Sequence, residues 1–372
     1  MPHLGENNRP GEKFPGLLLN RINNHIFGGM NMKHVSAKSL FLIVLSGIFF
    51  LSMTSAFAKT IELRFSSGFP VQQTITGKII VPWIEEINKA GEGKVSIKLF
   101  PAGALGKAPE QFDLAEKGVA DLSYHLADYT PGRFPLTTVF SLPFMPPSGE
   151  KVSEAMWKTF QKEVKYQEEY NKVKVLALFG HPGGHFHTVK TPIRTMADFK
   201  GLKMRTANPS ISKALTLWGA VPVAQPITET YQSLQLGVLD GTVLVWEGMG
   251  VFKLNEVTKF ATVADLYTMP MMIVMNKNSW DGLPDDVKAL LENTTGLKMS
   301  MAAGKAFDDA EKPFREMTLK KGVEEIILPP AELAKMREST FPLREEWATE
   351  MEAKGLPGKE ILKTALGFIE EK

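Results

Sequence analysis

The chain has 372 residues, with 43 lysines and arginines against 41 aspartates and glutamates, so its formal net charge at pH 7 is only +2. This near balance does not indicate nucleic acid or an anionic membrane as a partner, since both select strongly basic surfaces. Cysteine is absent, which excludes disulfides, thiol chemistry, cysteine-ligated metals and a lipid anchor on a cysteine. The length allows two ordinary domains with a core each.

The N-terminal part of the chain predicts export. Residues 1–31 are polar and show no sustained period, so we interpret them as a mis-annotated or disordered extension. Residues 32–58 have the parts of a cleavable signal peptide: a basic start, an apolar run over 40–51, and the small-x-small cleavage site at 56–58. The apolar run is short of the about 20 residues that a membrane span needs, so an uncleaved signal anchor is the weaker alternative. Without a cysteine to acylate, the exported chain is expected free in a Gram-negative periplasm.

After the signal, the pattern predicts alternating strands and helices. Alternating apolar and polar residues predict strands at 61–65 and 95–99. The apolar spacing of 76–89 predicts an amphipathic helix between them, which Pro82 kinks or shortens. This β-α-β order indicates a parallel crossover unit. The nearly continuous apolar run at 173–179 predicts a strand buried on both faces.

Shorter elements follow. Thr195 and Asp198 form a capping box, which predicts a short helix ending at Gly201. The glycine-rich break at 180–184 indicates that the chain crosses there from one α/β lobe to another. The remaining predicted elements are helices at 109–117 and 152–167, a strand at 202–205, helices at 208–218 and 228–236, strands at 242–246 and 271–275, helices through 283–310 and a strand at 323–328.

These elements predict an α/β protein of two lobes. We assign residues 59–182 and about 271–310 to lobe I. Residues 183–270 and about 311–372 are assigned to lobe II. The strand at 271–275 is expected to return to the first lobe.

Arg205 is the first candidate ligand-binding residue. It ends a short predicted strand directly before a helix begins, which is where open α/β lobes bind ligands. Its guanidinium is a planar fork that pairs with a carboxylate through two parallel hydrogen bonds. The alternative is a solvated charge on a strand edge.

Four histidines follow the presequence: His125, His181, His185 and His187. The His-x-His pair places two imidazoles on one face of a strand, so a zinc site has to be considered. The residues after it do not complete the pattern of metallo-β-lactamase-like hydrolases, and no acidic residue lies nearby in the sequence. Three interpretations stay open: a metal site, a structural role, and binding of an anionic or polar ligand. The enzyme alternative is a periplasmic zinc-dependent hydrolase that uses His181, His185 and His187.

Aromatic residues at strand ends are a third group of candidates. Trp246 ends a predicted strand, and Tyr124, Tyr129 and Phe69 lie at strand ends of the first lobe. Each is a core residue by default, but several of them in one cleft would favour a flat or apolar ligand. The nucleophile elbow, His-Glu-x-x-His, P-loop and Gly-x-Gly-x-x-Gly motifs are absent. We therefore expect a binding protein without catalytic residues or cofactors.

Several motifs spread over nearly the whole mature chain carry a family resemblance. They are the strand at 61–65, Leu99-Phe-Pro-Ala-Gly-Ala-Leu-Gly106, Lys117-Gly-Val-Ala-Asp-Leu122, Phe140-Ser-Leu-Pro-Phe144, Asp198-Phe-Lys-Gly-Leu-Lys-Met-Arg205 and the segment from Tyr231 to Gly241. Through them the chain resembles the solute-binding proteins of tripartite ATP-independent periplasmic (TRAP) transporters, of the C4-dicarboxylate-binding type. The set is highly specific, whereas any one motif alone would be weak.

This resemblance implies the periplasmic solute-binding protein fold: two α/β lobes joined by crossing strands, with a long helix spanning both. It implies that the lobes close on a ligand in the cleft, where the arginine matching Arg205 binds the carboxylate of an organic acid. It also implies a membrane permease, of a small and a large subunit, that receives the loaded protein and is driven by an ion gradient.

The chain departs from the family members that bind sialic acid. In this chain His185 occupies the position of their second arginine. Leu126 occupies the position of their acidic first-lobe residue, and Leu244 that of their amide residue. These exchanges remove polar contacts and add apolar area. We therefore expect a monocarboxylate with an apolar or aromatic body, held by Arg205 and hydrogen-bonded by His185 or His187. The expected ligand-binding residues are Arg205, His185, His187, Trp246, His125, Tyr124 and Phe69.

Overall fold

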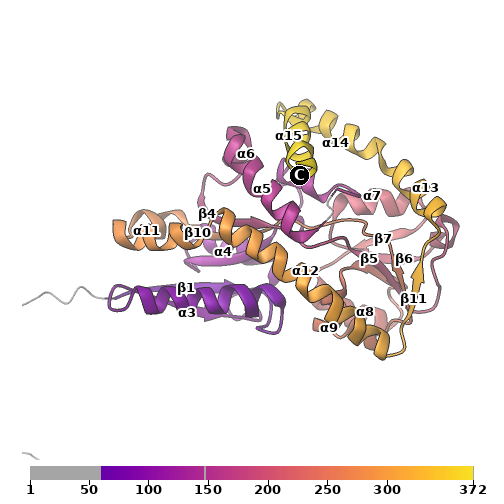
Figure 1. Cartoon of the computed structure of the whole chain (residues 1–372), viewed down its shortest axis with the longest axis horizontal. Helices are drawn as coiled ribbons and strands as arrows, with labels where there is room; N and C mark the ends of the chain where they lie inside the picture. The colour runs from indigo at the N-terminus through magenta and orange to yellow at the C-terminus, as the bar shows by residue number, and fades with distance from the viewer. Residues whose placement is uncertain (1–59, 146–147, 372) are drawn as a thin grey trace, which may run out of the picture. The chain divides into compact units, whose positions relative to one another are not determined.

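The part of the chain that the structure describes contains two β-sheets with helices packed on them (Figure 1). The computed structural model describes residues 60–145 and 148–371. The predicted extension at 1–31 and the predicted signal peptide at 32–58 lie outside these residues. No helix within the described ranges is long and apolar enough to cross a membrane.

The first sheet has the strand order β2-β1-β3-β10-β4. Its strands are β1 (Ile61–Ser67), β2 (Val95–Phe100), β3 (Leu122–Leu126), β4 (Val173–Phe179) and β10 (Met271–Asn276). Strands β1, β2 and β3 run parallel, whereas β10 runs antiparallel between β3 and β4. The strands predicted in this part of the chain are confirmed, including the buried strand at 173–179 and the return of 271–275 to the first sheet.

The crossover between β1 and β2 confirms the predicted β-α-β unit. Its helix is divided, because a π-helical turn (Thr76–Ile80) precedes α3 (Val81–Ala90). Pro82 lies just after this π-helical turn, at the start of α3, and its missing N–H accounts for the irregularity, which confirms that Pro82 disturbs the predicted helix.

The second sheet has the strand order β11-β9-β5-β8-β6-β7. Its strands are β5 (His185–Thr188), β6 (Lys203–Thr206), β7 (Val221–Ala224), β8 (Gly241–Leu244), β9 (Phe260–Val263) and β11 (Glu324–Ile327). The predicted strand at 242–246 was too long. Strand β8 ends at Leu244, and Trp246 begins the helix α9 (Trp246–Val251). The backbone N–H of Trp246 donates a hydrogen bond to the Glu311 carboxyl at 3.3 Å, which gives a free N–H of the first helical turn a partner.

The chain passes from the first sheet to the second between β4 and β5, as predicted, and returns between β9 and β10. The long helix α12 (Leu297–Lys320) packs against both α5 (Gly149–Lys162) and α9 (Figure 1). The expectation of crossing strands and a long helix spanning two α/β lobes is thereby confirmed. The other helices are α4 (Gln111–Glu116), α6 (Val164–Glu168), α7 (Pro209–Leu217), α8 (Thr230–Gln235), α10 (Lys277–Asp281), α11 (Asp285–Thr294), α13 (Pro330–Thr340), α14 (Pro342–Ala353) and α15 (Gly358–Glu370).

The C-terminal helices α14 and α15 pack against each other, and α15 also packs against α5. Trp347 and Ile361 of these helices belong to the same apolar cluster as Met156 of α5 and Val175 of β4. The C-terminal end of the chain therefore completes the core on one side of the first sheet. The predicted residue boundaries of the two lobes stay a prediction.

Candidate functional site

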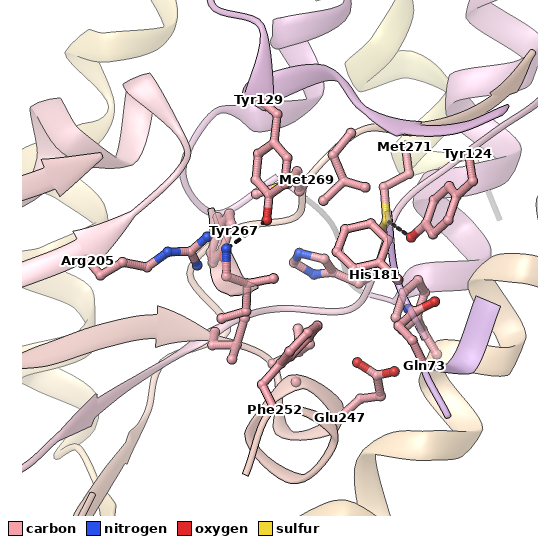
Figure 2. Close-up of a pocket in the computed structure, with 17 residues that line it drawn as sticks. Gln73, Tyr124, Tyr129, His181, Arg205, Glu247, Phe252, Tyr267, Met269 and Met271 are labelled. Atoms are coloured by element: carbon pink, nitrogen blue, oxygen red, sulfur yellow. Dashed lines mark hydrogen bonds between the residues drawn. The ribbon is translucent and has the colours of Figure 1, made fainter. Parts of the chain in front are cut away.

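A pocket lies between the two sheets, near the carboxyl ends of several strands (Figure 2). Phe69 follows β1, Tyr124 lies in β3, Arg205 lies in β6, and Leu244 ends β8; all four line this pocket. Its wall is made mainly of aromatic and aliphatic side chains with a few polar groups, which is typical of small-molecule sites. Its place matches the rule that open α/β sheets bind ligands beyond the carboxyl ends of their strands.

Arg205 is the one cationic side chain among the residues that line the pocket. It is only 1% exposed, and its Nε donates a hydrogen bond to the backbone carbonyl of Gln225 at 2.9 Å. Its Nη2 atom is buried and has no hydrogen-bond partner among the described residues. A buried cation without a partner is costly, so this guanidinium is prepared for an anion from outside the protein.

Tyr129 lies beside Arg205 (Figure 2). The Tyr129 hydroxyl oxygen accepts a hydrogen bond from the backbone N–H of Ile227 at 3.1 Å. Its own O–H is therefore left to donate elsewhere. Because Gln225 and Ile227 belong to one loop, the same short segment positions both donors, Arg205 and Tyr129, at one end of the pocket.

The middle of the pocket is lined by rings and thioethers. Phe69 lies 5.4 Å from Tyr124 and 6.3 Å from Phe252, measured between ring centroids. Met269 and Met271 also line this part, and the Tyr124 hydroxyl donates to the Met271 sulfur at 3.0 Å. Rings and methionines of this kind favour a flat, apolar ligand body.

The side of the pocket opposite Arg205 is polar again (Figure 2). Glu247 is 3% exposed, and its Oε1 accepts a hydrogen bond from the Thr74 N–H at 2.8 Å. Burial raises the pKa of the Glu247 carboxyl above its ordinary value. Gln73 is also buried, and its Oε1 accepts from the Thr76 N–H at 3.0 Å, which leaves the Gln73 amide N–H groups as donors.

His181 lines the pocket between these two ends. Burial lowers the pKa of its imidazole to about 4, so the ring is neutral at pH 7. Its Nδ1 lies 2.6 Å from the Pro182 carbonyl oxygen. Because a carbonyl only accepts, we assign the proton to Nδ1, which makes Nε2 a hydrogen-bond acceptor.

Three of the predicted ligand-binding residues, Arg205, Tyr124 and Phe69, are therefore on the pocket wall. His185, His187 and Trp246 are not; they form a separate buried cluster. The Trp246 ring centroid lies 5.3 Å from that of His185 and 5.2 Å from that of His187. Burial lowers the pKa of His185 to about 3 and that of His187 to about 4, so both are neutral.

His125 is the fourth predicted residue that lies away from the pocket. It is fully buried among the rings of Phe112 and Phe134, at centroid distances of 5.8 and 6.0 Å. Side chains alternate across a strand, so His125 points to the opposite face of β3 from its pocket-lining neighbours Tyr124 and Leu126.

The histidines do not form the zinc site of the hydrolase alternative. His181 lines the pocket, whereas His185 and His187 lie in the separate cluster. Within residues 60–145 and 148–371, no group of three histidine, aspartate or glutamate side chains is placed to hold a metal ion.

Sequence reasoning missed several pocket residues, of which Glu247, Gln73 and Tyr267 are polar. Glu247 follows the carboxyl end of β8. A charged residue at the end of a strand is the same signal that identified Arg205, so this signal could have identified Glu247 as well. Gln73 and Tyr267 lie in connecting segments. No local pattern marks such segments as part of a binding site.

Glu311 of α12 contacts both the cluster of His185 and Trp246 and the pocket residue Glu247. Its carboxylate oxygens lie 3.3 Å from the Trp246 N–H and 3.2 Å from the Glu247 N–H. His185 Nε2 lies 3.8 Å from Glu311 Oε2. Burial, together with the nearby Glu247 and Asp265 carboxyls, raises the pKa of Glu311 to about 8, although the N–H groups of Glu247 and Trp246 lower it.

This pKa predicts a pH-dependent contribution to folding stability. On folding, the pKa of this carboxyl rises from 4.5 to about 8. Its contribution to the free energy of unfolding is therefore fully present below pH 4.5 and is lost as the pH rises through about 8. The difference in melting temperature, Glu311→Gln minus wild type, is therefore expected to increase from pH 5 to pH 9. Differential scanning calorimetry measures it, with the exposed Glu316→Gln as control. A difference that is constant with pH would contradict the prediction.

Comparisons with known proteins agree on one family. The sequence profile described as bacterial extracellular solute-binding protein, family 7 (DctP), matches residues 65–350. The C4-dicarboxylate-binding periplasmic protein DctP of Rhodobacter capsulatus is 30% identical over 295 residues, which are 79% of this chain and 88% of that protein.

Solved structures show the same fold with aromatic acids bound. A TRAP solute-binding protein from Rhodoferax ferrireducens T118, in complex with copurified benzoate, is 32% identical with a TM-score of 0.80, over 83% of this chain and 98% of that chain. A marine metagenome TRAP solute-binding protein, described as specific for aromatic acid ligands and co-crystallised with 3-hydroxybenzoate, is 35% identical with a TM-score of 0.80. The match covers 84% of this chain and 98% of that one.

Proposed function

This chain belongs to family 7 of the bacterial extracellular solute-binding proteins, and from that premise we propose that it captures a small aromatic monocarboxylate. The family and the structures compared are solute-binding proteins, so the chain is a binding protein and not an enzyme, as the sequence predicted. The hydrolase alternative finds no support in them.

The observation that carries the proposal is the buried Arg205 guanidinium at one end of an aromatic pocket, whose Nη2 has no hydrogen-bond partner among the described residues. A ligand carboxylate would accept from Nη2 and from the Tyr129 hydroxyl. It would thereby neutralise a charge that the protein leaves uncompensated. The rings of Phe69, Tyr124 and Phe252 would bury the ligand body.

A single carboxylate is favoured over two. Arg205 is the one cation among the described residues that line the pocket, and the acidic group facing it across the pocket is the carboxyl of Glu247. A C4-dicarboxylate would place its second charge against rings or against this carboxyl, at a cost that no second cation among the described lining residues offsets. The relatives solved with benzoate and 3-hydroxybenzoate support the aromatic class.

Binding would close the two lobes on the ligand, because Arg205 belongs to the second sheet and Tyr124 to the first. In this proposal the protein is exported to the periplasm by a signal peptide at 32–58. The loaded form then delivers its ligand to the small and large membrane subunits of a TRAP permease that is driven by an ion gradient.

A thermal-shift panel tests the proposal. Benzoate, hydroxybenzoates and mandelate should raise the melting temperature, whereas succinate, sugar acids and zinc should leave it unchanged. A ligand at about 100 times its Kd stabilises the folded state by about 2.7 kcal/mol, which is a shift of several degrees. A shift with succinate or a sugar acid, and none with any aromatic acid, would overturn the proposal.

A further inference from the structure

We infer that Glu247 and Gln73 make this pocket selective for aromatic acids that carry a hydrogen-bond donor, such as a ring hydroxyl, at the end remote from the carboxylate. The inference rests on the proposed function, because it takes the carboxylate to be bound at Arg205. It names a narrower class of ligand and the residues that select it.

The pocket has two polar ends and an apolar middle. Arg205 and Tyr129 lie on one side, and Glu247 and Gln73 lie on the other (Figure 2). A ligand anchored at Arg205 with a flat body in the middle therefore extends toward Glu247. An unsubstituted ring would bury this second polar end without giving it a partner.

The Glu247 carboxyl has hydrogen-bonding capacity to spare. Its Oε1 accepts from the Thr74 N–H at 2.8 Å, and the Thr74 side chain is the other group of the protein that hydrogen-bonds to this carboxyl. The backbone N–H of Glu247 is already bonded to Glu311, at 3.2 Å. A carboxyl has about four acceptor sites, so a ligand hydroxyl can still donate to it and add a hydrogen bond to a buried acidic group.

Gln73 complements Glu247. Its Oε1 is fixed by the Thr76 N–H at 3.0 Å, so its remaining groups on the pocket side are amide donors. A hydroxyl both donates and accepts, which satisfies Glu247 as acceptor and Gln73 as donor. A second carboxylate at the same place has no proton to donate and would meet the carboxyl of Glu247.

The test measures the affinity of the purified protein for matched ligands by titration calorimetry. The ligands are benzoate, its three hydroxy isomers, 3-methoxybenzoate and benzene-1,3-dicarboxylate. The best hydroxy isomer is expected to bind about 10- to 100-fold more tightly than benzoate, because benzoate cannot make the hydrogen bonds to Glu247 and Gln73. The methoxy acid, which cannot donate, and the diacid should show no such gain.

Two variants assign the selectivity to Glu247. Glu247→Leu should remove the hydroxyl advantage, so that within this variant the best hydroxy isomer and benzoate bind with equal affinity. Glu247→Gln keeps the size of the side chain and an oxygen that can accept from the Thr74 N–H, so it is the second test variant if Glu247→Leu does not fold. It should lose most of the affinity gain that the ring hydroxyl gives over benzoate. Glu229→Gln, at an exposed position in the same half of the chain, should behave as wild type.

The outcomes separate this inference from the proposed function. Equal affinities for benzoate and every hydroxybenzoate in wild type would overturn the inference and leave the proposed function standing. An advantage that persists in both Glu247 variants would also overturn it. Failure of every aromatic acid to bind would overturn the proposed function itself.

Discussion

Arg205→Ala is expected to abolish detectable binding of aromatic acids. The variant removes the only cation of the pocket wall, and truncating one partner of a buried charge pair costs about 2–5 kcal/mol. The melting temperature of the empty protein should stay near that of wild type, because Arg205 makes one hydrogen bond, to Gln225, and buries an unpaired charge. Titration calorimetry and a ligand-free melting curve measure the two effects.

Arg194 provides the matched control. It lies in the same half of the chain, its side chain is 57% exposed, and it forms an ion pair with Glu324 at 2.7 Å. Such exposed pairs contribute little, so Arg194→Ala should bind and melt as wild type does. If Arg205→Ala still binds the same acids, or loses its folded state, then Arg205 is a structural residue and the carboxylate site lies elsewhere.

Gly304→Val is expected to have the largest effect on stability. At Gly304 the helix α12 meets α5 so closely that a Cβ atom would lie 2.2 Å from the Gly149 carbonyl oxygen and 2.4 Å from Ser153 Oγ. Asp308 of α12 also accepts the Gly149 N–H at 2.7 Å, so the helices cannot separate without losing that bond. Overpacking typically costs about 1–3 kcal/mol, and more where backbone must move.

The measurement is the melting temperature, with Gly367→Ala as control. Gly367 lies in α15 with nothing within 4 Å of a Cβ built there. Replacing this exposed helical glycine should stabilise the protein slightly, by up to about 1 kcal/mol. We expect Gly304→Val to lower the melting temperature by roughly 5 °C or more, or to prevent folding. A variant that melts as wild type would contradict the close helix contact.

Much of the fold could be predicted because its signals are local. The capping box of Thr195 and Asp198 does form around a short 3₁₀ helix (Met196–Phe199). The alternating patterns at 61–65 and 95–99 give paired parallel strands. Arg205 was found for the same reason, since a charge at the end of a strand is visible in the sequence.

The rest of the site depends on which face of a strand meets the pocket, and the pattern leaves this open. His185 and His187 share a face of β5, as predicted, but that face packs against Trp246 and near Glu311. His125 directly follows Tyr124 in the sequence, so its side chain lies on the other face of β3. A shift of one position therefore separates a pocket residue from a core residue.

Other pocket residues come together only in the folded chain. Gln73 and Glu247 are far apart in the sequence, and the hydrogen bond from the Thr74 N–H to Glu247 joins their segments. Met269 and Met271, next to each other around Pro270, also lie on the pocket wall. Such contacts between loops follow from tertiary packing, which no periodic pattern encodes.

The central claim is that the pocket takes one aromatic monocarboxylate, and titration calorimetry with benzoate and succinate on the purified protein tests it most directly. We predict that benzoate binds with a stoichiometry of about one per chain and a negative heat-capacity change, because rings bury apolar surface. Succinate should give no binding heat. Saturable binding of succinate, with no heat from benzoate or any hydroxybenzoate, would contradict the account.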